Sequence, residues 1–172
     1  MVAIINWNNT GTITPPSGWT EHNMYFPSSG GTMGLYYKVA GGSEPSDYTW
    51  SFDAASRVSG AIVTFQGSYA ADPREGAYSE NEDVFAEATA NTVTTTNDCA
   101  IVLYLSAYDE PLGDIWTAPS GWSIATANDG SGNCVIGYRY FATAGATGSA
   151  AFTCTNGSAA FGNYLWAFIR ND

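Results

Sequence analysis

The chain has 172 residues, 45% of them hydrophobic and 15% aromatic, which is enough for one domain with a large core and too apolar for a disordered protein. Sixteen acidic residues against five basic ones give a formal net charge of −11, which repels nucleic-acid backbones and anionic membrane surfaces. Only 12% of the residues are charged, so Ser, Thr, Asn and Gly must form much of the surface, a composition typical of exported or particle-surface β proteins.

The first residues, "MVAIINW", contain neither a basic leader nor an apolar run that ends in a cleavage site. No segment reaches the roughly 18 consecutive apolar residues of a membrane-spanning helix. We therefore expect no conventional export signal and no membrane partner. A protein of this kind would reach an extracellular surface by assembly into something larger.

Most of the chain has the composition of β-strands, with β-branched and aromatic runs between clusters of Gly, Ser, Asn and Pro. In chain order, strands are predicted at 2–7, 34–39, 48–52, 60–65, 99–108, 134–141, 150–154 and 163–169, and 91–96 also has strand composition. The one helix candidate, 82–90, is short and lacks capping signals. The sequence therefore predicts an all-β fold.

One turn occurs twice: "TPPSGWT" at residues 14–20 returns as "TAPSGWS" at residues 117–123. In the first copy Pro16 presets φ for the second turn position and Gly18 suits the fourth, and Pro119 and Gly121 repeat this in the second copy. Trp19 and Trp122 follow the two turns directly. They are interpreted as equivalent core residues, and Trp50 and Trp166 as further core residues.

The similarity extends beyond the turn. "MGLYYKV" aligns with "VIGYRYF", placing Gly34 on Gly137 and Tyr37 on Tyr140, and "VAIINW" matches "AIVLYL" upstream. Four strands thus occur twice in the same order, with a period too long for a solenoid repeat.

Two units that each have one apolar face suit two antiparallel sheets packed face to face. We predict a single β-sandwich domain over residues 1–172, related internally by a pseudo-twofold axis. The half-repeats would cover about 1–67 and 99–172, with an acidic linker at about 68–98.

These segments resemble a known kind of domain. "TITPPSGWT", "YYKVAGGSEPSDYTWSF" and "GAIVTFQG", followed by "APSGWS" and "ATAGATGSAAF", are similar to duplicated β-sandwiches of Ig-like or jelly-roll type. Such domains occur in bacteriophage capsid-decoration and tail-fibre proteins and in some secreted bacterial proteins. The resemblance implies a surface or assembly role and no catalytic residues.

The duplication is short by one strand on its N-terminal side, because strand-like residues precede 99–108 and none precede 2–7. The resulting edge would be apolar and uncharged, which natural edge strands usually avoid. We therefore predict an assembly edge at Val2, Ala3, Ile4, Ile5 and Trp7, covered by another subunit or virion protein. The alternatives are that the acidic linker covers the edge or that the sequence begins inside a longer chain.

No catalytic motif is present, and no catalytic, metal or cofactor site is predicted. The single histidine, His22, follows a turn and is interpreted as a loop residue. The segment from Asp72 to Glu87 carries six acids and one Arg, and "YDEPLGD" carries Asp109, Glu110 and Asp114. These are interpreted first as a solvated acidic loop, second as calcium ligands and third as a glycosidase pair.

Cysteines and aromatic residues complete the candidates. Cys99, Cys134 and Cys154 have no zinc-ligand spacing, and three buried thiols are favoured over one disulfide. Four aromatic residues lie in or near predicted loops, where they would bind a sugar ring or anchor a protein interface: Trp7, Tyr69, Tyr78 and Trp116.

These observations favour a non-enzymatic bacteriophage structural protein on the virion surface, acting like a capsid decoration or cement protein. Its partners would be other virion proteins or copies of itself. The alternative is an extracellular carbohydrate- or host-receptor-binding module of a tail fibre or secreted bacterial protein, with a host glycan as ligand.

Overall fold

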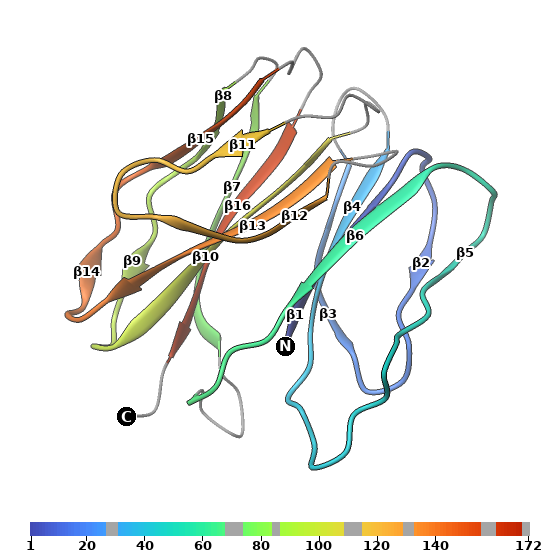
Figure 1. The fold of residues 1–172 in the computed structure, drawn as a ribbon, viewed down its shortest axis with the longest axis horizontal. Helices are drawn as coiled ribbons and strands as arrows, with labels where there is room; N and C mark the ends of the chain where they lie inside the picture. The colour runs from blue at the N-terminus through green and yellow to red at the C-terminus, as the bar shows by residue number, and fades with distance from the viewer. Residues whose placement is uncertain are drawn as a thin grey trace.

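The computed structural model of the chain describes residues 1–26, 31–67, 74–83, 87–108, 115–128, 133–155 and 161–169. These residues form sixteen β-strands and no helix, so the all-β prediction is confirmed (Figure 1). Within the same ranges there is accordingly no helix that could cross a membrane.

Two large sheets organise the molecule, and all their pairings are antiparallel. The first sheet contains, in spatial order, β3 (Thr20–Tyr25), β4 (Thr32–Tyr37), β1 (Val2–Trp7) and β6 (Val58–Val63). The second contains β12 (Ser123–Asn128), β13 (Asn133–Phe141), β10 (Ala100–Tyr108), β16 (Phe161–Ile169) and β7 (Arg74–Asp83). Strands β1 to β6 thus lie on one side of the molecule and strands β7 to β16 on the other (Figure 1).

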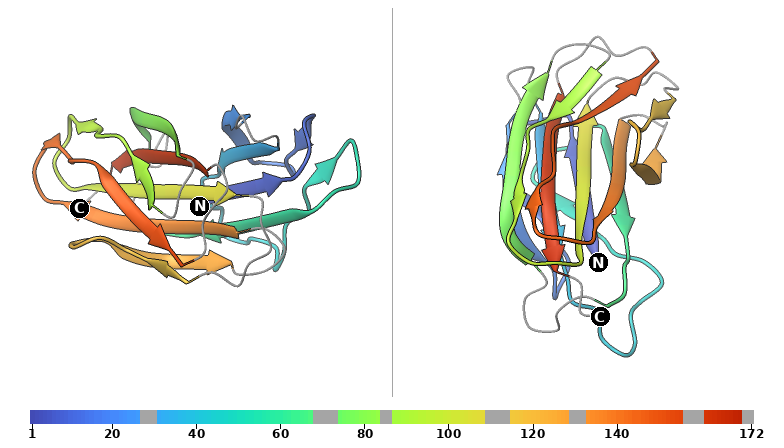
Figure 2. Two further views of the ribbon diagram at one scale, coloured as in Figure 1. Left: turned by 90° about the horizontal axis from the view of Figure 1, so that it is seen from above. Right: turned by 90° about the vertical axis from the view of Figure 1, so that its left-hand side faces the viewer.

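The two large sheets pack face to face, as a β-sandwich requires. Val2 and Ile4 of β1 lie in one apolar cluster with Leu103 and Leu105 of β10, and Trp166 of β16 fills the same layer. The strands of the two sheets run in roughly the same direction, as the right-hand view in Figure 2 shows. This is the aligned packing that twisted sheets favour.

Each large sheet is also covered on its other face by short strands. Over the first sheet lie β2 (Ile13–Thr14) and β5 (Ser51–Phe52), which bury Ala3, Ile5 and Trp7. Over the second lie β11 (Trp116–Thr117), β15 (Ala150–Cys154) and β8 (Glu87–Ala90). A further pair, β9 (Thr94–Thr95) and β14 (Gly145–Ala146), extends that cover. Because both faces are buried, β1 and β10 have continuous apolar runs instead of a strict alternation.

Strand β1 is the centre of the first sheet. It pairs with β4 on one side and with β6 on the other, over residues 2–7 in both cases, and all six side chains are buried. The prediction that Val2, Ala3, Ile4, Ile5 and Trp7 form an unpaired assembly edge is therefore wrong. The prediction considered only strands that precede β1 in the chain, whereas the second partner of β1 is β6, which follows it.

The predicted acidic linker contains regular structure. Residues 74–83 form β7, which pairs with β16 and is an outer strand of the second sheet. Residues 87–90 and 94–95 form β8 and β9. The negative charges of this segment therefore lie partly on a strand, where we expected a loop.

The repeated turn has the same conformation in both places. The amide of Trp19 donates to the carbonyl of Pro16 (3.2 Å) and the amide of Trp122 to that of Pro119 (3.1 Å), so each turn begins at Pro and its third residue is Gly. Gly18 and Gly121 have φ of +83° and +81°, as the third position of a type II turn requires. We predicted Pro at the second turn position and Gly at the fourth, whereas the structure has Pro at the first position and Gly at the third.

Replacing Gly18 by Ala should lower the free energy of unfolding by about 1–2 kcal/mol, because an L side chain is strained in the left-handed region. Gly121→Ala should cost a similar amount. Gly42→Ala is the matched control, since an added Cβ there meets no atom within 4 Å. Urea denaturation of the three variants measures the effect, and equal stability of all three would contradict the turn assignment.

Candidate functional site

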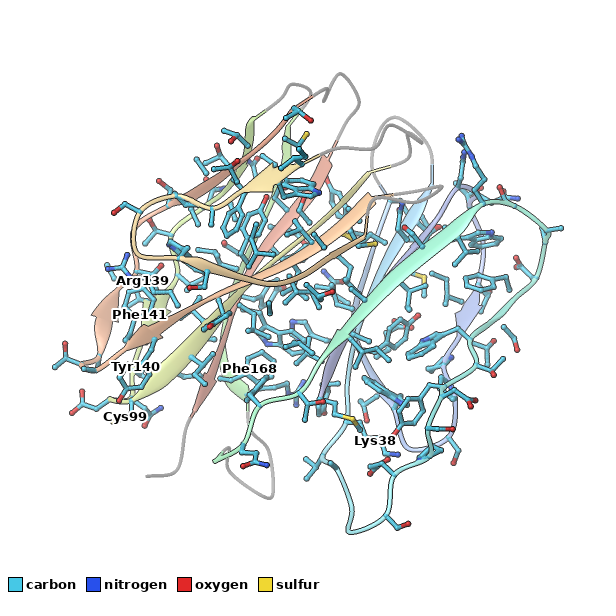
Figure 3. All side chains as sticks on the ribbon, in the orientation of Figure 1. Lys38, Cys99, Arg139, Tyr140, Phe141 and Phe168 are labelled. Carbon is cyan, nitrogen blue, oxygen red and sulfur yellow. The ribbon has the colours of Figure 1, made fainter. Side chains whose placement is uncertain are left out.

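Two tyrosines of β13 lie on the inner face of the second sheet, beyond the part that the first sheet covers. Side chains alternate along a strand, so Tyr138 and Tyr140 continue the row that begins with Cys134 and Ile136 inside the core. Tyr138 is 43% exposed and Tyr140 is 45% exposed. The apolar layer between the sheets thus reaches the surface near the end of β13 where Figure 3 labels Tyr140.

An apolar groove borders Tyr138. Its volume is about 410 Å³, and it is lined by residues 63–65 at the end of β6, Ile101 and Leu103 of β10, Ile124 and Ala125 of β12, and Tyr138. Ring packing fixes one wall, because Phe65 meets Phe168 edge-on at 5.1 Å between ring centroids. None of the lining residues is charged. Besides backbone groups, only the hydroxyls of Thr64 and Tyr138 offer hydrogen bonds there.

A polar network joins the two large sheets at the side away from the groove. The side-chain amide of Asn23 donates to Glu80 Oε2 (3.1 Å) and to the Tyr164 hydroxyl (2.9 Å), which itself donates to Glu80 (3.1 Å). Burial and the neighbouring Glu80 carboxylate raise the pKa of Tyr164 above its ordinary value. The described contacts of Glu80 thus link β3, β7 and β16, a structural role.

The same region contains the single histidine. The imidazole of His22 stacks on Trp166, with ring centroids 3.8 Å apart and planes 12° apart, and Tyr78 packs edge-on against it at 5.2 Å. His22 lies on strand β3, at the point where the pairing of β3 with β4 skips one residue. The interpretation of His22 as a solvated loop residue is therefore wrong, and its ring packs between the sheets.

The aromatic residues predicted to bind a ligand differ in how far their rings are exposed. Trp116 is only 6% exposed and Trp7 is fully buried, so neither presents a ring to a ligand. Tyr78 is half exposed and lies on β7 against His22. Tyr69 is outside the described residues. The predicted core residues Trp19, Trp122 and Trp166 are buried, and Trp50 packs against Trp19 at 5.2 Å.

The acidic candidates form no centre within the described part of the chain. There, no group of three or more His, Cys, Asp or Glu side chains is placed to hold a metal ion. One carboxylate oxygen of Glu75 accepts from the amides of Thr96 and Asn97, which ties β7 to the segment after β9. Asp72, Asp109, Glu110 and Asp114 are outside the described residues.

The three cysteines are free thiols, with Cys134 and Cys154 buried and Cys99 partly exposed. Burial raises the pKa of Cys134 to about 12, so this thiol is a poor nucleophile. It lies 3.1 Å from the Ser59 hydroxyl in the layer between the sheets.

Sequence reasoning missed a second buried polar group. The Tyr104 hydroxyl donates to the backbone carbonyl of Ala88 (2.9 Å) and lies 3.1 Å from Asn163 Oδ1, to which the Ser106 hydroxyl also donates (2.7 Å). These atoms are buried and bond one another, so they stabilise the cover strand β8 over β10. Buried polar networks of this kind specify packing and need no functional explanation.

One charged cluster lies beside the first sheet, where Figure 3 labels Lys38. The Lys38 ammonium donates to Glu44 at 2.6 Å, the Tyr48 hydroxyl donates to the same carboxylate, and the amino group of Met1 donates to the Lys38 carbonyl at 2.8 Å. Hydrogen bonds from Lys38, then Tyr48, then the Gly41 amide lower the pKa of Glu44 to about 2. The cluster fastens the start of β1 and the 39–50 segment, which is a structural role.

The Glu44 cluster predicts a pH dependence of stability. Because the folded-state pKa of Glu44 lies below its ordinary value of 4.5, the carboxylate stabilises the fold above pH 4.5, and this contribution is lost as the pH falls towards 2. Glu44→Gln should therefore lower the melting temperature at neutral pH and leave it unchanged near pH 2. Lys38→Gln should remove most of the same pH-dependent difference. A Glu44→Gln effect that is equal at both pH values would contradict this assignment.

Comparisons with known proteins add no functional residue to those described above. A scan against protein-family models, a search of curated proteins and a search of solved structures found no match to the chain. The apolar groove, which Tyr138 lines, is the candidate site on its geometry and chemistry.

Proposed function

We propose that the protein acts without catalysis, as a structural or assembly component that binds another protein through the apolar groove. The observation that supports this most is the chemistry of the groove: an uncharged, largely aliphatic and aromatic surface on a chain with a net charge of −11. Depletion of charge and enrichment of Tyr and Phe are the features that distinguish the centres of protein interfaces.

A carbohydrate ligand is the second candidate, favoured by the two half-exposed tyrosine rings on one face of β13. Sugar hydroxyls that lose water on binding need new hydrogen bonds, and each one left without a partner costs affinity. The groove offers the hydroxyls of Thr64 and Tyr138 and few other polar side-chain atoms. A protein side chain or an apolar segment therefore fits it better than a sugar.

The biological setting rests on the sequence resemblance. Duplicated sandwiches of the Ig-like or jelly-roll kind in bacteriophages imply a virion surface protein that decorates or cements a capsid, and the groove supplies a surface for that contact. An extracellular receptor-binding module is the alternative setting.

We propose that the two halves of the domain are an internal duplication. The orders β3-β4-β1-β6 and β12-β13-β10-β16 correspond strand for strand, and the pairing of β3 and of β12 skips one residue at His22 and at Ala125 respectively. Lys38 lies against Gly18, and Arg139 against Gly121. The register, however, places Thr20 opposite Tyr37 and Ser123 opposite Tyr138, so Tyr37 corresponds to Tyr138 rather than to Tyr140.

A large and a small residue exchange strands between the two sheets, which further supports the duplication. In the first sheet Ala3 lies opposite Tyr36, and in the second Tyr104 lies opposite Gly137. Each pair has one ring and one small residue, on opposite strands in the two sheets. The space beside Gly137 is filled by Phe152, whose Cζ would lie 2.3 Å from an added Cβ.

Charge placed in the groove should abolish partner binding. Ala125 and Ala127 are both exposed on β12, but only Ala125 lines the groove, so Ala125→Glu is the test and Ala127→Glu its matched control. We expect the wild type and the control to co-purify with particles from the source and Ala125→Glu to be lost from them. On a glycan array all three should bind nothing. Specific retention of a glycan that Ala125→Glu loses and Ala127→Glu keeps would contradict the proposal and favour the carbohydrate alternative.

A further inference from the structure

The four outer strands of the two large sheets differ in how well they resist pairing with another strand. These are β3, β6, β7 and β12, each of which has one recorded partner strand among the described residues. Charged side chains and β-bulges protect natural edges from unwanted pairing. Strand β7 carries five charged residues, β3 carries Glu21 and a register skip at His22, and β12 has a register skip at Ala125.

Strand β6 has none of these protections. Its sequence, Val58-Ser59-Gly60-Ala61-Ile62-Val63, contains no charge and no Pro, and its six residues pair with β1 without a register skip. Val58 and Ile62 point to the same face and are 37% and 39% exposed. In Figure 1, β6 runs along the edge of the first sheet that faces the viewer. A regular, apolar, uncharged edge is the kind that accepts another strand.

The second large sheet has a strand at the corresponding place. In the first sheet, β6 lies beside β1 on the side away from β4. In the second sheet, β16 lies in the same way beside β10, on the side away from β13. The outer side of β16 is paired with β7 over most of its length. Beside β6, no such fifth strand exists among the described residues.

We propose that β6 pairs with β6 of a second copy of this chain, antiparallel and across a twofold axis, so that the two four-stranded sheets become continuous. A twofold axis perpendicular to a sheet makes two identical edge strands antiparallel, which is the pairing type found throughout both large sheets. The inference deepens the proposed assembly role and rests on it.

The residues of β6 are complementary to themselves in this arrangement. A register centred on Gly60 places Val58 opposite Ile62 in both symmetric positions, so the two exposed apolar side chains become cross-strand neighbours. Because β6 has no charged residue, no like charges oppose each other across the paired strands. Because each copy carries a net charge of −11, long-range repulsion opposes the dimer, and screening by salt at physiological ionic strength or above should favour it.

Sedimentation velocity of the full chain over a range of concentrations tests the proposal. At high concentration the apparent mass of the wild type should be twice the 18.2 kDa of the monomer, and on dilution the dimer should dissociate. Ile62→Lys places a charge on the pairing edge and should raise the dissociation constant at least tenfold. Ile115→Lys is the matched control, because Ile115 is 69% exposed and lies before β11, away from β6. It should leave the dimer unchanged.

Val58→Lys provides a second variant should Ile62→Lys fail to fold, as judged by near-ultraviolet circular dichroism, and it should weaken the dimer similarly. A wild type that stays monomeric at every concentration would overturn the inference, as would a dimer that folded Ile62→Lys and Ile115→Lys affect equally. The groove proposal is tested separately, by particle binding of Ala125→Glu. If the groove does not bind particles but the β6 dimer forms, only the groove proposal fails. If particles bind but the chain stays monomeric, only the β6 proposal fails.

Discussion

The apolar layer between the two large sheets is the contact on which the rest of the structure depends. Val2 and Ile4 meet Leu103 and Leu105 there, and each such fully buried side chain contributes roughly 1.5–3 kcal/mol. Since β1 and β10 are covered on both faces, neither strand can carry a charge, and neither does. In the part of the chain that the structure describes, the acidic residues therefore lie on outer strands, cover strands and connections, which explains how a chain with a charge of −11 has a neutral centre.

The sequence predicts best the strands that this layer requires. All eight predicted segments that are rich in apolar residues contain strands. Strands β1 and β10 have continuous apolar runs because both of their faces are buried, whereas β6 and β15 alternate between buried and more exposed side chains. Strands β3 and β12 were missed because they are outer strands with polar, partly exposed side chains, and β7 was interpreted as a linker because its charges protect an edge. The position of β1 was mistaken because strand pairing is non-local: composition shows that β1 is apolar but not which later strand lies beside it.

The candidate site was hidden from sequence reasoning for a related reason. Tyr138 and Tyr140 have the same alternation as the buried residues before them, so only the extent of the first sheet decides where the row becomes exposed. Conversely, Trp116 follows a predicted loop, yet the cover strand β15 pairs with β11 and buries it. The groove lies where the six-residue strand β6 ends and the nine-residue strands β10 and β13 continue, and the outer side of β6 has no partner strand among the described residues. The two proposed interaction surfaces thus follow from the short length of β6 and from its place at the edge of the first sheet.

Residue-resolved amide hydrogen exchange of the dilute, monomeric protein tests this arrangement most directly. If β1 is central and β6 is an edge, every amide from Ala3 to Asn6 should exchange only through global unfolding, because neighbouring strands bond β1 on both sides. Along β6, the amides that point away from β1 should exchange orders of magnitude faster than those that point towards it. Fast exchange at alternate positions of β1, with uniform protection along β6, would contradict the account.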